Sequence, residues 1–203
     1  MNPFAVFVSG NGTNMENLIK AAKDGRLQAE PALVICDQPA APAIEKAERL
    51  GVPVCVVERK NFNSKEEFEA GIIRGLEAKK IEWIALAGFM RILSSDFVRR
   101  YHGKIINVHP ALLPSFPGAH AIRDAFEAKV KETGVTVHFV DEGVDTGPVI
   151  LQKKIAVNPG ESLESFEEKI HKIEYEIYPE ALGRVFSGAV RLPKHGSDLW
   201  TND

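Results

Sequence analysis

Short apolar runs alternate with amphipathic helical patterns through the first half of this chain, and this alternation constrains the fold more than any other feature. The apolar runs cover residues 4–8, 32–36, 52–57, 82–87 and 105–109. Between them, apolar residues recur at helical spacing over about residues 15–22, 41–50, 64–79 and 97–101. Buried strands joined by helices predict an α/β fold, with a mostly parallel, twisted sheet and helices on both faces.

The second half of the chain continues with less regular patterns. A helix is expected over residues 121–130, and residues 135–140 alternate polar and apolar, which is typical of a strand with two unlike faces. Another strand is expected over residues 149–151. A long amphipathic helix begins near Glu161, and Pro179 is expected to kink it or end its first section. Residues 187–203 are expected to form a short strand and a tail.

Composition limits the class of partner more than it limits the fold. The 203 residues suit one domain, and the formal net charge of −3 favours neither nucleic acid nor an anionic membrane. No apolar run is long enough to span a membrane, and the first residues lack the pattern of a signal peptide. A cytoplasmic protein is therefore expected, with Cys36 and Cys55 as reduced core residues.

The first strand is followed by the glycine-rich turn 9–14, which leads into a helix. A strand, a glycine turn and a helix amino terminus together favour an anion site, because free N–H groups and the positive dipole end meet there. Thr13 and Glu16 also form a T-x-x-E capping box, which is compatible with that site. Met15 replaces the third glycine of G-x-G-x-x-G, which favours a mononucleotide phosphate, although Asp37 keeps dinucleotide binding open as an alternative.

Asn107 and His109 stand at the end of the fifth apolar run, just before a proline-rich loop. Two residues apart on a strand, their side chains point to the same face. An amide can donate to an oxyanion, and an imidazole exchanges protons near neutral pH. A histidine satisfied within a turn is an equally good interpretation on these residues alone. An aspartate such as Asp145, in the later turn 141–148, would favour the protonated ring if it met His109.

Other candidate residues keep two interpretations each. Residues 88–93 form either the wall of a pocket for a flat aromatic ligand or a bridge of core residues. Lys65 is either a ligand contact or an ordinary surface lysine, and Glu174 either binds ribose or is a surface acid. His138 is either a support for the site or, as we expect, a strand histidine satisfied by its neighbours.

Five motifs together resemble the phosphoribosylglycinamide formyltransferases (glycinamide ribonucleotide transformylases), folate-dependent formyltransferases of purine biosynthesis. They are SGNGTN at 9–14, AGFMRIL at 87–93, NVHPALLP at 107–114, FPG at 116–118 and VDTGP at 144–148. The resemblance implies the formyltransferase fold over residues 1–203 as a single domain. Its Rossmann-like half, residues 1–100, would bind the nucleotide phosphate, and residues 101–203 would carry the catalytic and folate-binding groups.

The resemblance also assigns roles. It places the nucleotide phosphate on Gly12, Thr13 and Asn14 and the ribose on Glu174. The catalytic residues would be Asn107 and His109, which stabilise the oxyanion, and Asp145, which keeps His109 protonated. Folate would contact Asn107 and the backbone of 141–145, together with Lys65, Met90, Arg91, Ile92 and Leu93.

Loop 111–131 resembles the mobile lid of this family. Within it His120 matches the family pattern, while Ile122 replaces a histidine seen in some relatives. The co-substrate would be 10-formyltetrahydrofolate, without a metal, and the protein a monomer or weak homodimer acting on small molecules. A methionyl-tRNA formyltransferase would add a basic domain and a formyltetrahydrofolate hydrolase a preceding regulatory domain; from the length and charge we expect neither. The hydrolase, and a non-catalytic nucleotide-binding domain, are the alternatives.

Overall fold

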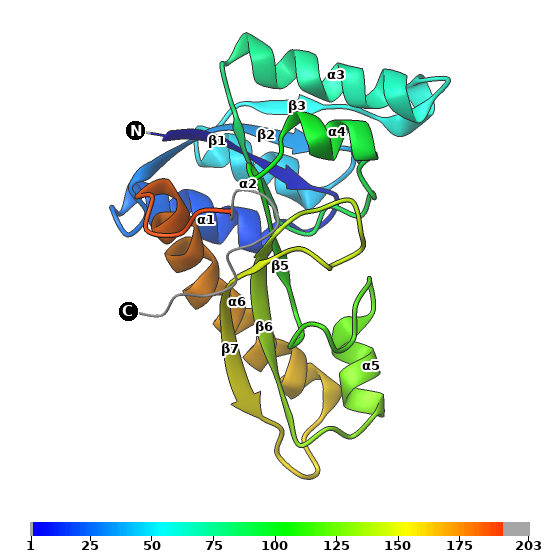
Figure 1. Ribbon diagram of the computed structural model, residues 1–203, viewed down its shortest axis with the longest axis vertical. Helices are drawn as coiled ribbons and strands as arrows, with labels where there is room; N and C mark the ends of the chain where they lie inside the picture. The colour runs from blue at the N-terminus through cyan, green and yellow to red at the C-terminus, as the bar shows by residue number, and fades with distance from the viewer. Residues whose placement is uncertain (1, 193–203) are drawn as a thin grey trace.

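Seven strands form one sheet in the computed structural model, which describes residues 2–192 (Figure 1). The strands are β1 (Asn2–Val8), β2 (Ala29–Cys36), β3 (Val54–Val56), β4 (Trp83–Leu86), β5 (Ile105–His109), β6 (Glu132–Phe139) and β7 (Val149–Ala156). Their order is β3-β2-β1-β4-β5-β6-β7. Strands β1 to β5 run parallel to one another. Strand β6 is antiparallel to β5, and β7 is antiparallel to β6. The predicted mostly parallel sheet is confirmed.

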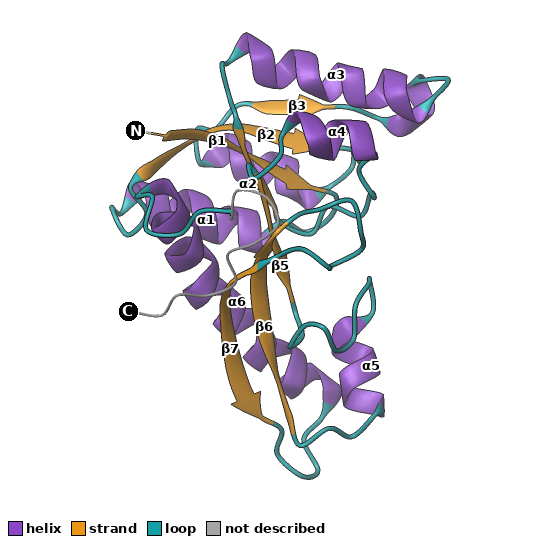
Figure 2. Cartoon of the chain, in the orientation of Figure 1, coloured by secondary structure: helices purple, strands orange, loops and turns teal. Residues whose placement is uncertain are grey.

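Helices cover both faces of this sheet, as predicted (Figure 2). They are α1 (Thr13–Lys23), α2 (Pro42–Arg49), α3 (Lys65–Ala78), α4 (Ser95–Arg100), α5 (Ala121–Glu127) and α6 (Leu163–Phe186), with a short 3-10 turn η1 (Arg59–Asn61). On β1, Phe4, Val6 and Val8 pack with α1, α2, α5 and α6. Ala5 and Phe7 pack with α3 and α4 on the opposite face. The two-residue period of a strand thus divides the apolar residues between two cores.

The turn between β1 and α1 differs from the predicted capping box. Gly12, with φ +72°, precedes α1, and no side chain caps the helix. A Cβ atom at Gly12 would lie 2.6 Å from Ala43 Cβ, so glycine is required by the close approach of α2 as well as by the backbone. The capping role of Thr13 was therefore wrong. Helix α3 does have a side-chain cap, since Ser64 Oγ accepts a hydrogen bond from the Glu67 N–H at 3.1 Å.

Pro179 neither ends α6 nor leaves a backbone group unsatisfied. Helix α6 continues through it from Leu163 to Phe186. A proline cannot donate to the carbonyl four residues earlier, here that of Tyr175. The side-chain amide of Asn17, on α1, donates to this carbonyl at 2.9 Å. A side chain from a neighbouring helix thus replaces the missing backbone bond and ties α1 to α6.

Two further expectations concern β6 and the end of the chain. The alternating pattern of β6 predicted two unlike faces, and residues 133–139 are buried on both faces because β6 lies between β5 and β7. Residues 187–192 contain no strand, and the rest of the predicted tail lies outside the described residues.

Cys36 is buried and Cys55 half-buried, and both are free thiols, as expected. Burial raises the pKa of each thiol.

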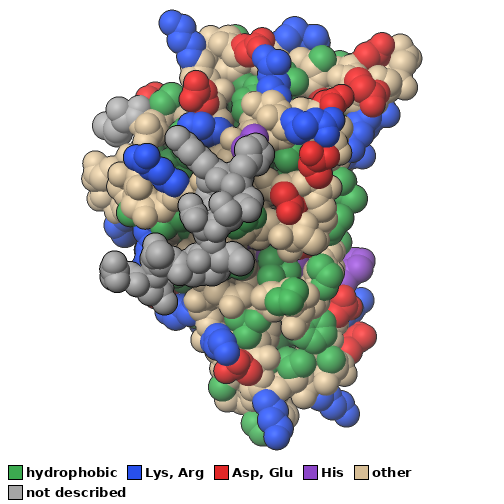
Figure 3. All heavy atoms as spheres, in the orientation of Figure 1, with side chains coloured by type: hydrophobic (Ala, Val, Ile, Leu, Met, Phe, Trp, Pro, Cys, Tyr) green, Lys and Arg blue, Asp and Glu red, His purple; other side chains and the backbone are tan. Residues whose placement is uncertain are grey.

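The surface of the described residues carries charges of both signs. On the face in Figure 3, Lys and Arg side chains are interspersed with Asp and Glu. None of the helices within residues 2–192 is long and apolar enough to cross a membrane.

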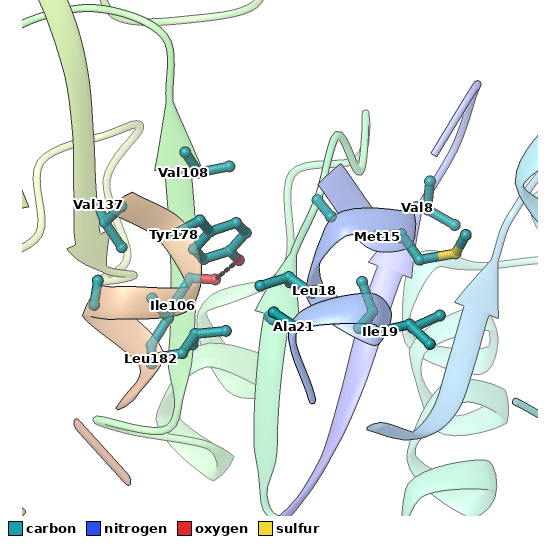
Figure 4. Packing of buried hydrophobic residues seen from close by; sticks show 14 of the residues in the cluster. Val8, Met15, Leu18, Ile19, Ala21, Ile106, Val108, Val137, Tyr178 and Leu182 are labelled. Carbon is teal, nitrogen blue, oxygen red and sulfur yellow. Dashed lines mark hydrogen bonds between the residues drawn. The ribbon is translucent and has the colours of Figure 1, made fainter. Parts of the chain in front are cut away.

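Tyr178, a fully buried residue of α6, connects this helix to two central strands. Its hydroxyl reaches the carbonyl oxygens of Leu86 on β4 and Ile106 on β5, at 2.9 and 3.0 Å. Figure 4 shows the hydrogen bond to Ile106. Burial raises the pKa of this phenol well above its ordinary value. Tyr178→Phe leaves both carbonyls without this partner, so its free energy of unfolding is expected to fall by about 1–3 kcal/mol.

Urea unfolding followed by circular dichroism measures this loss. Tyr175→Phe is the matched control, because it removes the same atom from the same helix at a residue that is only half-buried. Equal stability of the two variants would contradict the role assigned to the Tyr178 hydroxyl.

Candidate active site

A cavity of about 880 Å³ lies at the carboxyl ends of β1, β4 and β5. The chain leaves β1 toward β2 and β3 and later returns to place β4 on the other side of β1. Ligands of open α/β sheets bind at such a reversal of strand order. The loop from β6 to β7 and one turn of α6 close the remaining sides. Every predicted site residue lines this cavity except Lys65, which begins α3.

Asn107 and His109 lie on β5 at the floor of the cavity. The imidazole of His109 is buried, with Nδ1 3.4 Å from Asp145 Oδ2 and Nε2 2.7 Å from the Phe116 carbonyl oxygen. A carbonyl only accepts, so Nε2 carries a proton and donates it. The amide nitrogen of Asn107 lies 3.4 Å from Asp145 Oδ1. The structure therefore brings together all three residues that the sequence predicted to be catalytic.

Asp145 is the centre of this cluster. Its backbone has φ +54°, a conformation that aspartate tolerates better than most side chains. Besides its contacts to Asn107 and His109, the carboxylate accepts the Gly118 N–H at 2.8 Å and lies 3.6 Å from His138 Nε2. The His138 ring, the Gly118 N–H and His109 outweigh desolvation and lower the pKa of Asp145 to about 2. Asp145 is consequently ionised at neutral pH.

His138 takes part in the cluster, which our expectation missed. Its Nδ1–H donates to the Phe139 carbonyl at 2.8 Å, as expected of a satisfied strand histidine. Its Nε2, however, lies 3.2 Å from the amide nitrogen of Asn107. Residue 138 pairs with residue 107 across the antiparallel β5–β6 ladder, so the contact depends on a strand direction that the sequence did not predict.

The glycine turn and Glu174 occupy the opposite end of the cavity. Asn14 donates from Nδ2 to Glu174 Oε2 at 2.9 Å, while its buried Oδ1 has no partner in the described part of the chain. Glu174 is buried and also bonds His171 Nδ1 at 2.8 Å. This hydrogen bond raises the pKa of His171. His171 was not among the predicted site residues, although its spacing of three residues from Glu174 predicts a shared helix face.

Residues 88–93 line one wall of the cavity, and Phe89 among them also packs in the core. Met90 and Ile92 are 67% and 71% exposed, while the Met90 N–H donates to Ser9 Oγ at 2.8 Å. Arg91 Nε lies 2.6 Å from the buried carboxylate of Asp37. Asp37 is buried, paired with Arg91 and not among the residues that line the cavity, so it is not placed to bind a ribose as the acid of a dinucleotide fold would.

The sequence profile of the formyl transferase family matches residues 2–182. The chain belongs to this family.

Individual relatives agree with this assignment. The phosphoribosylglycinamide formyltransferase of Bacillus subtilis (strain 168) is 47% identical over 90% of this chain and 93% of its own length. The trifunctional purine biosynthetic protein adenosine-3 of Gallus gallus is 44% identical over 97% of this chain, which covers 20% of that protein. The crystal structure of glycinamide ribonucleotide transformylase 1 from Geobacillus kaustophilus superimposes with a TM-score of 0.89 at 51% identity, covering 91% of this chain and 98% of the other.

The loop after β5 of this formyl transferase is anchored next to His109. Thr136 Oγ1 donates to the Ala111 carbonyl at 2.6 Å and accepts the Leu113 N–H at 3.1 Å. His120 is exposed just before α5, and Ile122 packs against the core. The resemblance of residues 111–131 to a lid stays a prediction, as does the contact of Lys65 with folate.

The low pKa of Asp145 predicts a pH-dependent contribution to stability. Because the pKa falls from 3.8 to about 2 on folding, the ionised carboxylate stabilises the fold above about pH 4. This contribution, about 2 kcal/mol, is lost as the pH falls toward 2. The free energies of unfolding of the wild type and Asp145→Asn should therefore differ more at pH 6 than at pH 3 in urea titrations. A difference that does not change with pH would contradict this.

Proposed function

We propose that this chain transfers the formyl group of 10-formyltetrahydrofolate to the amine of glycinamide ribonucleotide. The products would be formylglycinamide ribonucleotide and tetrahydrofolate, in de novo purine biosynthesis. The observation that carries the proposal is the position of Asn107, His109 and Asp145 in the same cavity as the glycine turn. The names of the relatives support the same reaction.

The two ends of the cavity suit the two substrates. The first N–H groups of α1, at Thr13 and Asn14, have no partners within the helix and would bind the phosphate, while Glu174 would bind the ribose hydroxyls. The exposed apolar side chains of Met90 and Ile92 offer a surface for the folate ring, with Arg91 and Leu93 beside them. The formyl carbon and the amine would then meet above Asn107 and His109.

The reaction begins with attack of the glycinamide amine on the formyl carbon, which places negative charge on the formyl oxygen. The imidazolium of His109 and the amide of Asn107 would stabilise this oxyanion. In the structure the Phe116 carbonyl accepts the Nε2–H of His109, and the oxyanion would replace it as acceptor. The contact of Asn107 with Asp145 is long, at 3.4 Å. The oxyanion would therefore be the stronger acceptor for the amide N–H and would draw it toward the substrate.

Collapse of the tetrahedral intermediate breaks the bond from the formyl carbon to the folate nitrogen. The attacking nitrogen loses a proton and the folate nitrogen gains one, so no net proton is consumed. His109 would donate the proton to the folate nitrogen and would be reprotonated by the proton that the attacking nitrogen gives up, with Asp145 favouring the protonated ring. The buried position of both groups excludes water from this step.

A two-substrate assay tests this function. Purified protein is mixed with glycinamide ribonucleotide and a 10-formyl folate, and the deformylated folate is followed by absorbance. Product is expected only when the nucleotide is present; equal product without it would favour a hydrolase. Tight binding of NAD without formyl transfer would favour a non-catalytic nucleotide-binding domain. A cytoplasmic location and a monomeric or weakly dimeric state remain parts of the proposal.

A further inference from the structure

Helix α2 contacts three successive residues of the glycine turn, Gly10, Asn11 and Gly12. The Ala43 N–H donates to the Gly10 carbonyl at 3.3 Å. The Nζ of Lys46 donates to both the carbonyl oxygen and Oδ1 of Asn11, each at 2.9 Å. Gly12 packs directly on Ala43, where any Cβ would clash. These contacts bind two consecutive carbonyl groups of the turn to one helix.

This arrangement has an electrostatic consequence for an anion in the cavity. The carbonyl oxygens of the turn carry partial negative charge and would repel a phosphate if they faced it, whereas the free N–H groups of α1 attract it. By bonding two oxygens of Asn11, Lys46 keeps both turned toward α2. Lys46 is only 19% exposed in its side chain and is not among the residues that line the cavity. It therefore acts on a bound anion through the turn and not by direct contact.

The charge on Lys46 is only partly offset by its surroundings. Glu16 Oε2 lies 3.8 Å from Lys46 Nζ, but the other oxygen of this carboxylate is bound by Lys20 at 2.6 Å. The closest contacts of Lys46 Nζ are the two oxygens of Asn11, so the principal role of Lys46 is to hold the turn.

We propose that Lys46 is a positioning residue for the phosphate-binding turn, which increases affinity for a phosphorylated substrate without contacting it. The proposal rests on the proposed function, because that function places the nucleotide phosphate at Gly12, Thr13 and Asn14. Lys46 would thus affect binding of the phosphate and not the chemical step at His109.

Lys46→Met tests this role, because it keeps the aliphatic stem and removes the charge and donors. We expect the KM for glycinamide ribonucleotide to rise about tenfold, the size expected for loss of a charge-assisted hydrogen bond. The kcat and the KM for the folate should change less than twofold. Lys46→Arg should recover most of the affinity, since a guanidinium can donate to both Asn11 oxygens. Lys20→Met, which removes the other partner of Glu16, is the matched control and should behave like the wild type.

A substrate without phosphate separates positioning from a general loss of structure. Glycinamide ribonucleoside should react poorly with the wild type, and Lys46→Met should not raise its KM further. An equal rise for nucleotide and ribonucleoside, or equal effects of Lys46→Met and Lys20→Met, would overturn the proposal. Thermal unfolding checks that each variant folds, and Lys46→Gln replaces Lys46→Met if it does not.

Direct binding distinguishes failure of this proposal from failure of the proposed function. Calorimetry with glycinamide ribonucleotide alone requires no turnover. Weaker binding to Lys46→Met by an enzyme that does not transfer formyl would refute the function and support the role of Lys46. Unchanged binding together with normal formyl transfer by the wild type would refute the role of Lys46 alone.

Discussion

Replacing His109 by alanine is expected to lower kcat by about 10²–10⁴-fold, the range for loss of a general acid. The imidazole of His109 can both donate to the oxyanion and supply a proton to the departing folate nitrogen, whereas the amide of Asn107 can only donate a hydrogen bond. Its two nitrogens contact the Phe116 carbonyl and Asp145, so its orientation is set before substrate binds. The KM values should change little, because the phosphate and folate surfaces lie at other parts of the cavity.

Single-turnover kinetics with both substrates saturating would measure this loss without interference from product release. His102→Ala is the control, since this exposed histidine follows α4 and lies outside the cavity. Thermal unfolding would show whether the buried site still folds without the ring. A His109→Ala variant that folds and retains the wild-type rate would require another proton donor.

Most of the sheet was predictable, because four of the five parallel strands, β1, β2, β4 and β5, are short apolar runs with buried residues on both faces. The runs at 4–8, 82–87 and 105–109 predicted β1, β4 and β5 to within a few residues. The direction of β6 relative to β5 was harder to predict from the sequence. The return from β5 to β6 depends on the path of the loop after His109, and no local pattern in residues 132–139 distinguishes an antiparallel strand from a parallel one.

The candidate site was predictable where residues share one strand or one turn. Asn107 and His109 follow from the two-residue period, and the glycine turn follows from its place before a helix. The contact of Asp145 with His109 joins residues 36 positions apart in different elements, so it came from resemblance and needed the structure for its geometry. The pairing of Asp37 with Arg91 was missed for the same reason, although each follows the end of a strand beside β1.

Asp145→Asn is expected to lower kcat by about 10²–10³-fold, similar to the loss of a preorganised electrostatic group. The change keeps the size of the side chain and removes the negative charge beside the His109 and His138 rings. Without that charge Nδ1 of His109 faces a neutral amide in place of a carboxylate, so the ring loses the electrostatic partner that orients it toward the oxyanion. The Gly118 N–H, which donates to Asp145 Oδ2 at 2.8 Å, can still donate to an amide oxygen.

Thermal unfolding and the pH profile together distinguish electrostatic support from a structural effect of Asp145. Loss of structure would lower the melting temperature and would lower the rate by a similar factor at every pH, whereas loss of the charge should change the pH dependence of the rate in a variant that still folds. Asp96→Asn is the control, because this exposed aspartate lies on α4 outside the cavity. A kcat and pH profile unchanged in Asp145→Asn would show that the pairing with His109 has no catalytic role. A reduced rate with an unchanged profile would instead assign Asp145 to placing Gly118 and the loop around it, because that contact does not depend on the charge of the histidine.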